Sequence, residues 1–133
     1  MSAAPARFAS DGRGYDASNC VGVTKEAAME KLGVIGGMGA EATSYYYDQV
    51  VRHTAATCDQ EHIDMVVLSK STMPDRTLAI KTGEHAELLA TMKECAQALE
   101  SLGCAHIAIP CNTSHYFYDQ IQSFTKAVSY THL

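Results

Sequence analysis

Short apolar runs and longer stripes with helical spacing alternate along this chain. Three runs have the length and composition of buried strands: Leu32–Ile35, Asp64–Leu68 and Ile107–Ile109. Between them, apolar residues recur every three or four positions, which predicts helices over residues 40–57 and 83–101. The order strand, helix, strand, helix, strand predicts an α/β fold with a parallel sheet.

A polar cluster follows the third strand. Pro110 ends the ladder, and Cys111 opens the sequence Cys-Asn-Thr-Ser. Beyond it, the spacing of Phe117, Ile121 and Phe124 would place them on one face of a helix. We therefore expect a helix to start near Cys111, where the orphan N–H groups of its first turn would favour a thiolate. The alternative is that Cys111 is simply a small buried hydrophobe.

Each predicted strand ends in a polar loop, and the three loops cover residues 36–39, 69–76 and 110–114. Alternating strands and helices place helices on both faces of the sheet and give three layers. Because the carboxyl ends of parallel strands line the ligand crevice, these loops are expected to converge on one site.

The first loop, Gly36-Gly37-Met38-Gly39, allows a tight turn and a close backbone approach to a ligand. Gly37, Gly39 and Ala42 match the G-x-G-x-x-A pattern of dinucleotide-binding folds. The second strand should then end in an acidic residue for the ribose, and Ser69-Lys70 stands there instead. A tight turn without a ligand is the remaining alternative.

The second loop, residues 69–77, contains Arg76. Its guanidinium fork suits a carboxylate ligand. The competing interpretation is a surface ion pair with Asp75.

Composition narrows the classes of partner. The chain has 133 residues, enough for one domain, with 47% hydrophobic residues and a formal net charge of -5. The sequence contains no basic patch that would suit nucleic acid and no apolar run long enough to span a membrane. Its first residues also lack the pattern of a signal peptide. Neither nucleic acid nor a membrane is therefore expected as a partner.

The five cysteines form no CxxC pair, so no metal site is expected. An odd number of cysteines without such pairs favours a cytoplasmic chain with reduced thiols. Residues 1–28 have no clear periodicity, and Met29 directly precedes the first strand. We expect residues 1–28 to be a leader outside the domain, disordered or not part of the natural protein.

Three motifs, together with their order, resemble the aspartate/glutamate racemase family. They are Gly-Val-Ile-Gly-Gly-Met-Gly (33–39), Pro-Asp-Arg-Thr (74–77) and Ile-Pro-Cys-Asn-Thr (109–113). The continuation Ser-His-Tyr-Phe-Tyr-Asp (114–119) is similar to the aspartate racemase branch. The resemblance covers about Met29 to Lys126.

The resemblance implies a flavodoxin-like half of a two-domain amino-acid racemase that needs no pyridoxal phosphate or other cofactor. In such enzymes one cysteine removes the α-proton as a thiolate, and a second returns a proton to the opposite face. By this likeness Cys111 is the first catalytic cysteine. Met38, Arg76, Asn112 and Thr113 match substrate-binding residues, with Arg76 on a substrate carboxylate.

The second-domain motif of that family, Gly-Cys-Thr-Glu, does not occur here, and no cysteine follows Cys111. We therefore expect residues 29–126 to form an incomplete first domain that stops after the third strand and its helix, and the chain alone to be inactive. Residues 127–133 do not continue the family's next strand and look like a translated sequencing adapter. Apolar surface left uncovered would favour a homodimer.

Two other functions fit the same residues. One is a lyase or isomerase of the same superfamily that acts on a dicarboxylate such as maleate. The other is a non-catalytic module that binds small carboxylates.

Overall fold

The computed structural model describes residues 30–130, so the predicted leader, residues 1–28, lies outside the described residues. Within these residues, four strands and four α-helices follow one another in the order β1 (Lys31–Gly36), α1 (Ala40–His53), β2 (Met65–Ser69), α2 (Arg76–Thr82), α3 (Ala86–Ser101), β3 (Cys104–Ala108), α4 (Tyr118–Ser123) and β4 (Val128–Tyr130). The same range contains the short 3₁₀ helices Asp59–Glu61 (η4) and Asn112–Phe117 (η5).

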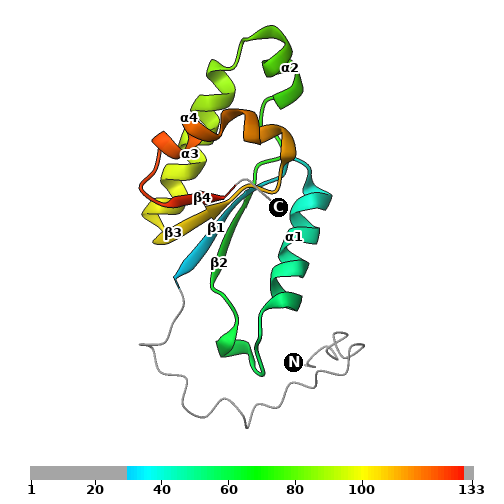
Figure 1. Ribbon diagram of the computed structural model, residues 1–133, viewed down its shortest axis with the longest axis vertical. Helices are drawn as coiled ribbons and strands as arrows, with labels where there is room; N and C mark the ends of the chain where they lie inside the picture. Colours follow the sequence, from blue (N-terminus) through cyan, green and yellow to red (C-terminus); the bar gives the residue numbers. More distant parts are fainter. Residues whose placement is uncertain (1–29, 131–133) are drawn as a thin grey trace.

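All strand pairs of the sheet are parallel, and the strand order is β2-β1-β3-β4. Helix α1 lies on one face, whereas α3 and α4 lie on the other (Figure 1). The predicted three-layer α/β fold is therefore confirmed. The prediction that the sheet stops after the third strand is wrong, because β4 pairs with β3 from Val128 onward.

The main core lies between the sheet and α3. Leu88, Met92 and Leu99 of α3 are at most 1% exposed, and they pack in one cluster with Ile35 of β1 and Ile107 of β3. Gly33 belongs to the same face, since a Cβ placed there would lie 3.0 Å from Leu99 Cδ1. The stripe predicted over residues 83–101 is thus the packing surface expected from its period.

The bounds of two helices differ from the prediction. Helix α1 ends at His53 rather than near residue 57, because the backbone at Thr54 turns to the extended region. Helix α2 was not expected. It begins within the predicted loop because the Asp75 carboxylate accepts a hydrogen bond from the Leu78 N–H at 2.8 Å and caps it, and it ends at the left-handed Gly83.

Candidate functional site

The loops after β1 and β2 are joined through their main chains. The Lys70 N–H donates to the Gly36 carbonyl at 2.9 Å. Gly37 has φ +91°, and a Cβ placed there would lie 2.6 Å from the Lys70 main chain. Only glycine fits this close approach of two backbones, so the predicted role of the glycine-rich turn is confirmed at Gly37.

The same loop is poorly suited to a phosphate. The Gly37 N–H already donates to the Thr43 Oγ1 at 2.8 Å, so it does not point at a ligand. Lys70 follows β2 where a dinucleotide fold would have an acidic residue. The geometry therefore favours the tight-turn interpretation over dinucleotide binding.

The loops after β1 and β3 meet at Met38. Its side chain is 5% exposed, and the Ser114 Oγ, fully buried, donates to the Met38 Sδ at 4.0 Å. Phe117 belongs to the same apolar cluster. Helix α2, which follows the loop after β2, packs against η5 and so brings this loop to the same place. The predicted convergence of three strand-end loops thus occurs in the structure.

Cys111 is a half-buried free thiol, separated from the end of β3 by Ile109 and Pro110. Its N–H donates to the Ile109 carbonyl at 2.8 Å, and its carbonyl accepts from the Ser114 N–H at 3.3 Å. The helix that follows is the 3₁₀ helix η5, and α4 begins only at Tyr118. The predicted helix start near Cys111 is therefore confirmed, with Cys111 as the N-cap, although the first turns are 3₁₀ rather than α.

Two other thiols differ from Cys111 in their surroundings. Cys95 and Cys104 lie in the core, and burial raises the pKa of both thiols. Neither is suited to act as a thiolate. Cys58 is disulfide-bonded, so the expectation of reduced thiols does not hold for it.

Asn112 and Thr113, the two further residues of the third loop, begin η5 beside Cys111. Asn112 is exposed and Thr113 is partly buried. Both therefore lie at the same edge of the sheet as the thiol. The neighbouring Ser114 was not singled out from sequence, although its place in a polar cluster after a strand is the signal that could have found it.

Arg76 is the first residue of α2 rather than a loop residue. Its Nη1 donates to the Pro74 carbonyl at 3.3 Å, while its Nε is buried without a hydrogen-bond partner in the described part of the chain. Asp75 caps α2 instead of pairing with Arg76. A buried guanidinium N–H without a partner is costly, and an anionic ligand would satisfy it.

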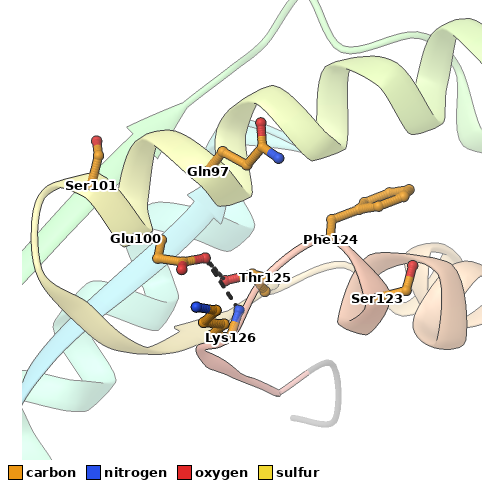
Figure 2. Close-up of a pocket in the computed structure, with 7 residues that line it drawn as sticks. All are labelled: Gln97, Glu100, Ser101, Ser123, Phe124, Thr125 and Lys126. Atoms are coloured by element: carbon orange, nitrogen blue, oxygen red, sulfur yellow. Dashed lines mark hydrogen bonds between the residues drawn. The ribbon is translucent and has the colours of Figure 1, made fainter.

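A separate cleft of about 590 Å³ lies between the C-terminal turns of α3 and the segment that follows α4 (Figure 2). The Glu100 Oε2 accepts hydrogen bonds there from the Thr125 Oγ1 at 2.7 Å and the Lys126 N–H at 3.2 Å. These bonds lower the pKa of Glu100, the Thr125 bond most. The cleft adjoins the amino ends of β3 and β4, so it is distinct from the Cys111 site.

Residues 30–130 contain no group of three or more metal-ligating side chains placed to hold a metal ion. None of the helices within this range is long and apolar enough to cross a membrane.

Comparison with known proteins gives one consistent match. Residues 35–132 match the family model for Asp/Glu/Hydantoin racemase. The chain is 32% identical over 95 residues to the broad specificity amino-acid racemase RacX of Bacillus subtilis (strain 168). The aligned region covers 68% of this chain and 40% of RacX.

Solved structures show the same likeness. An aspartate racemase of Picrophilus torridus superposes with a TM-score of 0.67 at 27% identity, over 77% of this chain and 43% of that one. An aspartate racemase homologue from Pyrococcus horikoshii OT3 has the same fold, with a TM-score of 0.63 at 23% identity over 77% of this chain and 45% of that one. The chain thus spans less than half the length of these relatives.

Proposed function

This chain belongs to the Asp/Glu/Hydantoin racemase family, and we propose that it carries the first half of a cofactor-independent racemase site for an acidic amino acid such as aspartate or glutamate. Cys111 is the base in this proposal. The observation that carries it is the convergence of a half-buried free thiol, Met38 and the Arg76 helix at one edge of the sheet.

The residue types suit the chemistry. An α-proton is only weakly acidic, so its removal needs a base close to Cα and hydrogen-bond donors for the charge that develops. The Cys111 thiolate would remove the proton, and a second acid on the opposite face would deliver another. Asn112 and Thr113 would hold the amino-acid backbone groups beside Cα.

Arg76 supplies the specificity for a carboxylate in this proposal. Its Nε is buried and lacks a hydrogen-bond partner in the described structure, and α2 packs against η5 near the thiol. A bidentate carboxylate would give the guanidinium two charge-assisted hydrogen bonds. Both the racemase and a lyase or isomerase on a dicarboxylate such as maleate would use this contact.

The first experiment is ligand protection of Cys111 against iodoacetamide, read by peptide mass spectrometry on the full chain. Saturating D- or L-aspartate, or glutamate, is expected to slow Cys111 modification about tenfold, since a ligand at the thiol excludes the reagent. Leucine amide, which has no carboxylate, is the control and should not protect. Protection by leucine amide equal to that by aspartate would contradict a carboxylate site, and protection by maleate alone would favour the dicarboxylate alternative.

The second experiment tests the two-cysteine mechanism through the interconversion of D- and L-aspartate. Racemisation needs an acid on the face of Cα opposite the base, and no cysteine follows Cys111 in this sequence, so the chain alone is expected to interconvert the enantiomers no faster than the buffer control. Chiral chromatography provides the measurement. Robust racemisation by the chain alone would show that another group, or a second copy of the chain, replaces the second cysteine.

A further inference from the structure

Thr43 bridges both ends of the loop that carries Met38. It is the buried residue of α1, with 5% of its surface exposed. Its Oγ1 accepts a hydrogen bond from the Gly37 N–H at 2.8 Å and donates one to the Gly39 carbonyl at 3.1 Å. A single hydroxyl therefore satisfies one donor and one acceptor on either side of Met38.

The loop is also confined sterically by Thr43. A Cβ placed on Gly36 would lie 2.4 Å from the Thr43 Cγ2, and one placed on Gly37 would lie 2.6 Å from the Lys70 main chain. Gly39, in contrast, has open space where a Cβ would lie. The loop is thus held between the α1 side chain and the β2 loop, and it is open where it leads into the helix.

Met38 links this loop to the loop that carries Cys111. Its Sδ contacts the Ser114 Oγ at 4.0 Å, and the Ser114 N–H donates to the Cys111 carbonyl at 3.3 Å. We propose that Thr43 is a positioning residue of the substrate site, whose hydroxyl holds the 37–39 loop so that Met38 lies against the Cys111 loop. This inference rests on the proposed function for its consequence in binding, but not for the loop geometry itself.

The test compares Thr43→Val, which keeps the branched shape and loses both hydrogen bonds, with Thr43→Ser, which keeps the hydroxyl. Thr91→Val is the matched control, because the Thr91 Oγ1 bonds only within its own helix, to the Glu87 carbonyl at 3.0 Å. Amide hydrogen exchange of Gly37 is expected to be about tenfold faster in Thr43→Val and unchanged in the other two variants. The amide of Ile107, in the core strand β3, serves as the reference for exchange through global unfolding. If Thr43→Val does not fold, Thr43→Ala replaces it.

Ligand protection gives the second readout. The aspartate concentration that halves the rate of Cys111 alkylation should rise about tenfold in Thr43→Val and return to the wild-type value in Thr43→Ser. Unchanged Gly37 exchange in Thr43→Val would overturn the inference, as would a Thr43→Ser variant that fails to restore protection. If aspartate does not protect the wild-type thiol, the proposed function fails, and Gly37 exchange still decides whether Thr43 holds the loop.

Discussion

The loops after β1 and β3 lie at the same edge of the sheet and are built in opposite ways. In the β1 loop, the main chain is enclosed by Thr43 on one side and the Lys70 backbone on the other. In the β3 loop, Cys111 is half-buried, Asn112 is exposed, and Cys111 places no side-chain cap on η5. The main chain of one loop is held by packing, whereas the other loop leaves Asn112 exposed and Cys111 partly exposed.

This difference suits the two tasks of such a site. A substrate-binding wall gains from a shape that does not relax when the ligand enters, because ordering it at that moment would cost binding free energy. A catalytic base must instead be accessible to the substrate, so that it can lie close to the proton that it removes. In the proposed site, the closed loop would therefore support the binding wall, and the open loop would offer the thiol.

The largest effect is expected from closing the space at Gly37. Gly37→Ala adds a Cβ 2.6 Å from the Lys70 main chain at φ +91°, so both strain and overlap should lower the free energy of unfolding by about 3 kcal/mol or more. Gly83→Ala is the control, because Gly83 also has a positive φ, of +74°, but no atom lies within 4 Å of its added Cβ. It should lose only about 1 kcal/mol. Equal losses in urea unfolding would show that the loop is not sterically closed.

A smaller effect is expected at Arg76, the residue of α2 that we propose binds the carboxylate of the ligand. Arg76→Lys keeps the charge but loses the planar fork, so the affinity for aspartate should fall about tenfold, or about 1.4 kcal/mol. Arg52→Lys is the control, since Arg52 is exposed and pairs with Asp48 at 2.6 Å within α1. Calorimetric titration of both variants with aspartate measures the two affinities. A comparable loss in Arg52→Lys would point to general electrostatic attraction rather than a specific contact.

Much of the fold could be predicted because the hydrophobic pattern agrees with the final packing. The α3 stripe that includes Met92 and Leu99 faces the sheet as its period requires. Helix α2 could not be found in this way, because it is short and depends on the Asp75 cap rather than on an apolar stripe. The contact of Ser114 with Met38 spans 76 positions, and no local pattern reveals such a pair.

The candidate site was predicted by two kinds of reasoning. Strand-end placement indicated the loop of residues 36–39 and Cys111, and the structure places both at the converging loops. The roles of Met38, Arg76, Asn112 and Thr113 came from the family resemblance, and they stay predictions until a ligand is measured. Thr43 escaped both, since a threonine inside a helix more often bonds only to its own helix.

The smallest effect concerns the enclosed thiols that contrast with Cys111. Burial raises the pKa of Cys95 and Cys104 above their ordinary value, so the folded state favours the neutral thiols. Their stabilising contribution is complete below the ordinary cysteine pKa of about 8.5 and is lost as the pH rises through the raised values. The free energy of unfolding should therefore fall between neutral and alkaline pH. Cys104→Ala should show a shallower fall than wild type in urea titrations at each pH. A fall in Cys104→Ala as steep as that of wild type would contradict a contribution from this thiol.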